Sequence, residues 1–411
     1  MIPIPYSKTT INLDLNIPSL TPRTFPPLPN IKEAVEKALF EPTHGEGIDK
    51  RTTGCKTASI VISDATRKTN SRLFLPIIVD TLISLGIKEI NVIVATGTHR
   101  PSTEDEKRKL CGDAYNRIEI IDHNCDSQGI HIGTTSRGTP VILNPYLLNA
   151  DIKILTGVVN FHYFAGFSGG YKSIVPGVAM RETIVKNHRL SITEEGFARG
   201  VEVAETEGNP VYEDIVEAGS MVDNTFLFNV IIGEAGIEAI FSGDVLQSHK
   251  SACKYLKGTR SVKISELKDA VIVSPGGYPY DINLLQSHKA MVMAERILKP
   301  GGTMIVLAEC PEGVGSESLQ ENLLIGNPNK VLQRLKGNYT VNLHSAFALL
   351  SKTHKFNTYI LTQNIPRDIA KKARINTLAS VNEIYDIISS NAVVLPKGSI
   401  TLPYANNPTN S

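Results

Sequence analysis

The chain has 411 residues, of which 41% are hydrophobic and 20% are charged, as is typical of globular proteins. This length exceeds one small module and predicts two domains. The 42 Lys and Arg residues nearly balance the 41 Asp and Glu residues, and the net charge of +1 excludes a strongly basic nucleic-acid-binding protein.

The cysteines and the hydropathy pattern indicate the compartment. Five widely spaced cysteines without a CxxC pair are typical of reduced thiols and disfavour a disulfide framework or a thiolate zinc site. We find neither the pattern of a signal peptide nor a run of about 18 apolar residues. We therefore expect a cytoplasmic protein that binds neither nucleic acid nor membranes.

Short apolar, β-branched runs recur along the chain, each followed by a polar or glycine-rich turn. They predict strands at 58–63, 90–96, 151–157, 269–274 and 303–308. Helical periodicity at 71–86 joins the first two strands into a βαβ unit, and residues 129–144 and 224–244 are predicted to be hairpins. The whole pattern predicts an α/β protein with mainly parallel sheets.

The polar segment 257–269 precedes a new series of strands, turns and helices and is the predicted domain boundary. We place an N-terminal α/β domain at 1–262 and a C-terminal α/β domain at 263–397. The C-terminal tail, residues 398–411, could fold back onto the N-terminal domain.

Polar residues at the carboxyl ends of the predicted strands are the first candidates for chemistry, because ligands of open parallel sheets bind there. Asp64, Thr66 and Arg67 follow the first strand, and His99 follows the second. Each has a structural alternative: Asp64 and Thr66 could cap the next helix, and His99 could be a hydrogen-bonded structural histidine. Seven further histidines show no metal-ligand spacing and are expected to be structural: His44, His123, His131, His249, His288, His344 and His354.

Residues 166–173 read GFSGGYKS and present Lys172 after a pair of glycines. A phosphate-binding P-loop requires GxxxxGK[ST], and Tyr171 stands where its last glycine would be. A tyrosine tolerates the required backbone poorly, so the match to a nucleotide P-loop is weak. The segment suits either phosphate binding or a lysine presented for covalent attachment.

Four blocks, taken in order, resemble the nickel-pincer lactate racemase family of 2-hydroxy-acid racemases and epimerases. The blocks are SDATR (63–67), ATGTHR (95–100), HYFAGFSGGYKSIVPGVAMRETIVKNH (162–188) and GGYPYDINLLQSHK (276–289). The resemblance implies two α/β domains with the active site in the interdomain cleft.

The resemblance also implies a cofactor, the nickel complex of a pyridinium-3-thioamide-5-thiocarboxylate mononucleotide (the nickel-pincer nucleotide), with Lys172 as its covalent tether. It implies that His188 is the protein's ligand to nickel, beside two sulfurs and one carbon of the cofactor. It further implies a set of cofactor-binding residues: Asp64, Thr66, Arg67, Ser168, Gly169, Gly170 and Ser173. Cofactor-synthesis enzymes are then expected partners for maturation.

For the reaction, the resemblance implies His99 and His162 as two acid/bases and Arg67, Gln286 and Lys289 as substrate-binding residues. Reversible hydride transfer to the cofactor would give a 2-keto acid that can rotate and take the hydride back on its other face. Imidazoles exchange protons near neutrality, which suits the hydroxyl proton. The expected substrate is a small 2-hydroxy acid such as lactate. The alternatives are a phosphate- or nucleotide-binding enzyme that uses residues 166–173, and a cofactor-free binding paralogue.

Overall fold

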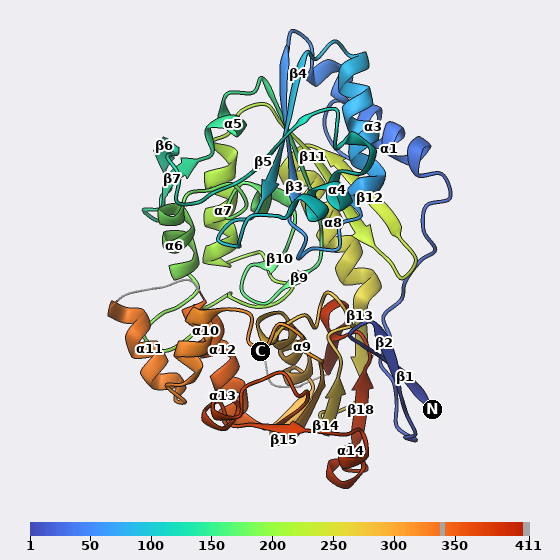
Figure 1. Ribbon diagram of the computed structural model, residues 1–411, viewed down its shortest axis with the longest axis vertical. Helices are drawn as coiled ribbons and strands as arrows, with labels where there is room; N and C mark the ends of the chain where they lie inside the picture. Colours follow the sequence, from blue (N-terminus) through green and yellow to red (C-terminus); the bar gives the residue numbers. More distant parts are fainter. Residues whose placement is uncertain (338–341, 406–411) are drawn as a thin grey trace. The chain divides into compact units, whose positions relative to one another are not determined.

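The computed structural model describes residues 1–337 and 342–405, which divide into two compact units (Figure 1). Unit 2 contains residues 24–191 and 198–256. Unit 1 contains residues 1–23, 192–197 and the described residues from Lys257 onward. Both units combine helices with a mainly parallel sheet, so the predicted α/β class is confirmed.

Unit 2 is built on a six-stranded sheet with the strand order β12-β11-β8-β3-β4-β5. Its strands are β3 (Thr57–Ser63), β4 (Glu89–Ala95), β5 (Glu119–Asp122), β8 (Ile152–Val158), β11 (Thr225–Ile232) and β12 (Ile237–Gly243). All neighbours are parallel except β11 and β12, which form the predicted hairpin at 224–244. Two short antiparallel pairs accompany the sheet: β6 (Ile130–Thr134) with β7 (Pro140–Leu143), and β9 (Phe161–His162) with β10 (Gly166–Phe167).

The helices of unit 2 include the predicted βαβ crossover, α3. They are α1 (Ile31–Phe40), α2 (Ile48–Arg51), α3 (Ser71–Ser84), α4 (Glu104–Cys111), α5 (Pro145–Leu148), α6 (Arg181–Arg189), α7 (Pro210–Ser220) and α8 (Val245–Arg260), with 3-10 turns η1 (Gly112–Ala114) and η2 (Gly170–Ser173). Leu39 of α1 and Phe74 of α3 are buried against Ile60 and Phe228 of the sheet. Burial of such side chains contributes about 1.5–3 kcal/mol each, which fixes the strands that carry the site.

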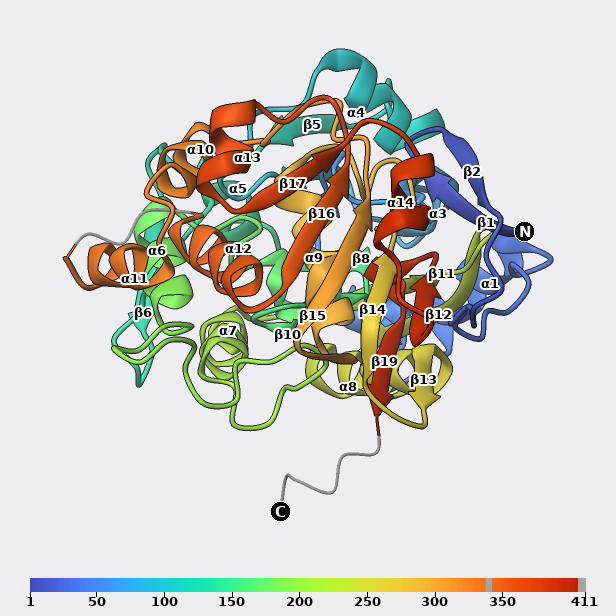
Figure 2. The ribbon, with the colours of Figure 1, turned by 90° about the horizontal axis from the view of Figure 1, so that it is seen from below.

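Unit 1 is built on a five-stranded parallel sheet with the order β17-β16-β15-β14-β18, whose strands lie side by side in Figure 2. They are β14 (Lys268–Val273), β15 (Leu298–Leu307), β16 (Asn357–Leu361), β17 (Ile375–Leu378) and β18 (Ala392–Leu395). The helices of this unit are α9 (Leu284–Glu295), α10 (Glu317–Leu323), α11 (Pro328–Gly337), α12 (Leu343–Lys355), α13 (Arg367–Lys372) and α14 (Asn382–Ile387), with η3 (Gly398–Ile400).

Both ends of the described chain belong to unit 1, which differs from the predicted division at residue 262. The hairpin of β1 (Ile2–Tyr6) and β2 (Thr9–Leu13) buries Ile4 and Leu13 in the same apolar cluster as Ile272 and Ile305 of the sheet. In the tail, β19 (Leu402–Ala405) pairs in parallel with β13 (Ser261–Ile264), and residues 406–411 lie outside the described part. Within residues 1–337 and 342–405, no helix is long and apolar enough to cross a bilayer.

Candidate functional site

His99 and Asp64 meet at the carboxyl ends of the neighbouring strands β4 and β3. His99 Nδ1 lies 2.6 Å from Asp64 Oδ2. Burial disfavours ionisation of Asp64, but the hydrogen bond with His99 and the charges of His99 and Arg67 outweigh it and lower the pKa of the carboxyl. The carboxylate therefore accepts the Nδ1–H of His99. A neutral His99 then presents an unshared pair at Nε2, where it can accept a proton.

The loop after β3 supports this pair. The Thr66 hydroxyl donates to Asp64 Oδ1 over 2.7 Å, so Asp64 is held from two sides. The alternative that Asp64 and Thr66 cap the next helix is wrong, because the residue preceding α3 is Asn70. Arg67 is half-buried, and its positive charge acts on both Asp64 and Lys172.

Residues 168–172, the lysine turn, depend on the two glycines. Gly169 and Gly170 have φ angles of +82° and +58°, a region that side chains rarely adopt. The Gly170 amide donates to Asn229 Oδ1 of β11 over 2.8 Å. A Cβ on Gly169 would lie 2.5 Å from that same oxygen, so the close approach to Asn229 also requires glycine.

Lys172 follows in η2 and is half-buried. Burial of its amino group, with a smaller contribution from the charge of Arg67, lowers its pKa to about 7. The uncharged fraction of this amine at neutral pH is therefore far larger than that of an ordinary lysine, which is almost entirely protonated. An uncharged amine is the nucleophilic form, which suits covalent attachment.

Phe164 brings three of the predicted residues together. Its ring centroid is 4.5 Å from that of His162 and 5.0 Å from that of His188. The Nζ atom of Lys172 lies 5.4 Å from the same centroid. His162 and His188 are both buried, at the end of β9 and in the last turn of α6. The predicted tether, one predicted acid/base and the predicted nickel ligand therefore surround one aromatic ring.

His162 has a different hydrogen-bond environment from His99. The Ala165 amide donates to His162 Nδ1 over 3.3 Å, so a neutral ring carries its hydrogen on Nε2. The ring also stacks on Tyr163, with 5.5 Å between centroids and 17° between planes. Nδ1 therefore lies against a carboxylate in His99 and accepts from a main-chain amide in His162.

Gln286 and Lys289 lie in the first turns of α9 in unit 1. The helix is capped by Asn283, whose Oδ1 accepts from the Gln286 amide over 3.0 Å. Lys289 is three residues further, on the same face of the helix, and its Nζ donates to Gln286 Oε1 over 2.6 Å. The structure therefore pairs these two predicted substrate-binding residues with each other.

The two serines of the turn are bound within the fold. The Ser168 hydroxyl donates to the Val158 carbonyl over 2.8 Å, and the Ser173 hydroxyl donates to the Thr156 carbonyl over 2.9 Å. The Gly170 amide, which a P-loop would turn toward phosphate, is engaged by a side chain of β11. This arrangement disfavours the P-loop alternative and gives both serines a role in holding the turn.

Among the described residues, metal-ligating side chains do not gather into a site of their own. In the described parts of the chain, no three His, Cys, Asp or Glu side chains gather closely enough to hold a metal ion. If His188 holds a metal, a cofactor that brings its own donors would complete the coordination. The nickel-pincer nucleotide, which brings sulfur and carbon donors, fits this donor set, and Lys172 beside the same phenyl ring fits its attachment.

Two features of the site were missed by sequence reasoning. The Asp64–His99 hydrogen bond was not predicted, although the two residues follow strands predicted to be neighbours. His249 was expected to be structural and does bond within the fold, but its contact with the lysine turn was not predicted: its Nε2 lies 2.9 Å from the Ser168 carbonyl oxygen and its Nδ1 lies 3.2 Å from the Tyr212 hydroxyl. No local signal could have indicated this contact, because it depends on how α7 and α8 pack against the lysine turn.

A lysine with a lowered pKa and buried histidines, carried by the loops, turns and helices around a mainly parallel sheet, define a candidate active site of an α/β protein. Family models match both parts of the chain. The model described as the lactate racemase N-terminal domain matches residues 6–200, and that of the lactate racemase C-terminal domain matches residues 264–386.

Individual relatives give the same result. The chain is 33% identical to the lactate racemase of Lactiplantibacillus plantarum over 345 residues, covering 81% of this chain and 80% of that protein. It is 32% identical to the lactate racemase of Thermoanaerobacterium thermosaccharolyticum over 328 residues, 77% and 76% of the two chains. The lactate racemase apoprotein structure from the latter organism aligns with a TM-score of 0.88 and 26% identity over 98% of this chain and 99% of that one. This chain belongs to the lactate racemase family, as its four sequence blocks predicted.

Proposed function

We propose that this protein racemises or epimerises a small 2-hydroxy acid with a nickel-pincer nucleotide bound covalently to Lys172. The observation that carries the proposal is the arrangement around Phe164, where a lysine with a pKa of about 7 lies with His162 and His188. His188 would hold nickel as its protein ligand. When bound, the cofactor supplies a carbon that accepts and returns a hydride.

In this proposal His99 takes the hydroxyl proton of one enantiomer at Nε2. The Asp64 carboxylate orients the ring through Nδ1–H and stabilises the imidazolium that forms. His162 serves the opposite enantiomer, whose hydroxyl lies on the other side of the reacting carbon. To accept a proton at Nε2, His162 must move its ring hydrogen to Nδ1 and give up the hydrogen bond from Ala165.

The substrate carboxylate needs fixed cations while the keto acid rotates. We assign this role to the guanidinium of Arg67 and the ammonium of Lys289. Gln286 orients Lys289 through their 2.6 Å hydrogen bond. Arg67 has a second effect, since its charge also favours the uncharged form of Lys172.

Co-production with the cofactor-synthesis enzymes, followed by intact mass and nickel analysis, tests the proposal. The wild type should carry the adduct, and Lys172→Ala should carry none. Lys186→Ala, which changes an exposed lysine of α6, is the matched control and should load normally. A full adduct on Lys172→Ala would place the tether elsewhere. A wild type without adduct or nickel that still bound a hydroxy acid would favour the cofactor-free paralogue.

The substrate requires its own experiment. Short, dicarboxylic, aromatic and sugar-derived 2-hydroxy acids should be tested with the loaded enzyme, with racemisation followed by chiral chromatography. We expect turnover of lactate or another short 2-hydroxy acid. Binding of phosphate or a nucleotide at residues 166–173, with no racemisation of any of these acids, would favour the alternative enzyme class.

A further inference from the structure

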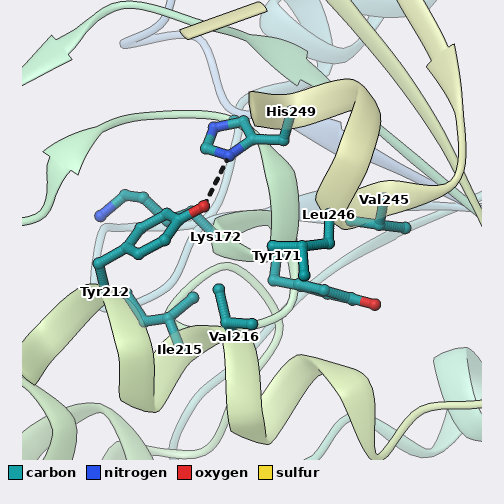
Figure 3. Close-up of a pocket in the computed structure, with 9 residues that line it drawn as sticks. Tyr171, Lys172, Tyr212, Ile215, Val216, Val245, Leu246 and His249 are labelled. Carbon is teal, nitrogen blue, oxygen red and sulfur yellow. Dashed lines mark hydrogen bonds between the residues drawn. The ribbon is translucent and has the colours of Figure 1, made fainter. Parts of the chain in front are cut away.

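A small cavity lies behind the lysine turn, against α7 and α8 of unit 2. Its volume is about 10 Å³, roughly the space of one water molecule. Tyr171, Lys172, Tyr212 and His249 contribute to its walls, and Figure 3 shows the Tyr212 hydroxyl directed at the His249 ring. The histidine and the tyrosine therefore face the back of the turn that presents the lysine.

The hydrogen bonds of His249 define its tautomer. A carbonyl oxygen only accepts, so the 2.9 Å contact with the Ser168 carbonyl requires the hydrogen on Nε2. Nδ1 of the neutral ring then accepts from the Tyr212 hydroxyl at 3.2 Å. Burial lowers the pKa of His249 to about 4. The hydrogen bond to Ser168 opposes this effect, and the charge of Lys172 adds to it. His249 is therefore neutral at physiological pH, and both of its ring nitrogens are engaged.

The ring also packs directly on the glycines. A Cβ on Gly170 would lie 2.7 Å from His249 Cγ, so the imidazole fills the space where a side chain would stand. On its other side the Gly170 amide is bound by Asn229. The main chain two residues before Lys172 is thus held between an amide side chain on β11 and an imidazole on α8.

We propose that His249 and Tyr212 are positioning residues for Lys172, fixing the main chain of the lysine turn so that the amino group stays at its desolvated place. This inference rests on the proposed function, in which that amine forms the covalent link to the cofactor. His249 acts on the turn directly, and Tyr212 acts by holding His249 in the tautomer that donates to Ser168. Neither residue is assigned contact with substrate.

The charges around the pair agree with this role. The titratable groups near Lys172 and His249 include Arg67 beyond β3, Tyr171 on the turn, and Tyr212 and Cys253 on α7 and α8, with His162 and His188 around the same Phe164 ring as Lys172. Arg67 already contributes a positive charge beside the lysine. A neutral histidine adds hydrogen bonds without adding a second cation, which a lysine or arginine at this position could not do.

The test uses the apoprotein and trace acetylation with acetic anhydride across a range of pH, with modification of Lys172 and Lys186 read by peptide mass spectrometry. In the wild type, Lys172 should react with a midpoint near pH 7. In His249→Leu the midpoint should rise by about one pH unit or more, which lowers the rate at pH 7 by at least about fivefold. His249→Gln keeps an N–H donor near the position of Nε2 and should restore most of the rate. Tyr212→Phe should shift the midpoint in the same direction by a smaller amount.

His123→Leu is the matched control. His123 is equally buried, and its Nε2 and Nδ1 are also engaged, by the Ala179 carbonyl at 2.9 Å and the Asn144 amide at 3.1 Å. Its loss should lower the melting temperature without moving the Lys172 midpoint. Equal shifts in His249→Leu and His123→Leu, or a wild-type midpoint in folded His249→Leu, would overturn the inference. If His249→Leu does not fold, an unshifted Tyr212→Phe overturns it.

Cofactor loading separates this inference from the proposed function. A wild-type protein that gains no adduct contradicts the proposed function, while acetylation of the apoprotein still tests the positioning role. The positioning role alone is contradicted if the wild type loads normally and the His249→Leu variant loads and is acetylated as the wild type is.

Discussion

Asp64→Asn should slow racemisation by about 10- to 150-fold. The change replaces the charged partner of His99 by a neutral amide of the same size and leaves the ring in place. Hydrogen bonds to charged groups contribute about 1.5–3 kcal/mol, and each 1.36 kcal/mol of transition-state free energy is a factor of ten in rate. The 2.6 Å contact should strengthen as the imidazolium forms, so its loss falls on the chemical step and lowers kcat.

The assay is chiral chromatography of the loaded enzyme from each enantiomer, combined with a double-mutant cycle. Because Asp64 acts through His99, the Asp64→Asn change should have little further effect in a His99→Ala background. Multiplicative losses in the double mutant would show that Asp64 contacts the cofactor or substrate instead. A loss of less than about threefold in the single mutant would refute the orienting role. Thr66→Val, which removes only the hydroxyl that supports Asp64, should cost about tenfold or less.

His99→Ala and His162→Ala should each reduce racemisation by about 10²–10⁴-fold. Since the equilibrium constant of a racemase is one, kcat/KM should fall equally in both directions; a variant that keeps more than about a tenth of the wild-type rate is not missing a catalytic base. His188→Ala should lose nickel, as measured by inductively coupled plasma mass spectrometry, while the adduct on Lys172 remains; wild-type nickel content would mean that another group holds the metal. Lys172→Met should raise the free energy of unfolding of the apoprotein by about 1–2 kcal/mol near pH 6.5, because it removes a buried ammonium. The folded pKa of about 7 lies below the ordinary 10.5, so the unfolded state binds more protons between these values, and the wild type gains stability as the pH rises through this window. In urea denaturation, the free energy of unfolding of Lys172→Met should therefore exceed that of the wild type by less at pH 9.5 than at pH 6.5. An equal excess at both pH values would contradict the reasoning.

The sheets were the predictable part of this fold. The apolar run at 58–63 is almost wholly buried in a parallel sheet and the run at 90–96 is buried in its middle, so their composition alone identifies β3 and β4. The amino-terminal hairpin could not be assigned to unit 1 in this way. Ile4 and Leu13 make an apolar face that any sheet could accept, and only the packing against Ile272 selects one.

The candidate site divides along similar lines. Residues at strand ends, such as Asp64 and His99, can be found from the sequence because parallel strands bring their carboxyl ends to one edge. Only the family resemblance implied roles for His162, His188 and Lys172, since their spacing along the chain carries no geometric signal, and their grouping around Phe164 was not predicted. His249 escaped both routes, because its role depends on the contact of α8 with a turn far away in the sequence.

The unequal partners of the two histidines have a kinetic consequence. Two enantiomers are mirror images, but a carboxylate beside His99 and a main-chain amide beside His162 are not. Proton removal by His99 at Nε2 uses the tautomer that Asp64 already holds, whereas proton removal by His162 at Nε2 requires a tautomer change first. The maximal velocities with the two enantiomers as substrates should therefore differ. Their Michaelis constants should differ by the same factor, because an equilibrium constant of one requires only that kcat/KM be equal in the two directions. A racemic mixture hides this asymmetry, and initial rates from each pure enantiomer reveal it.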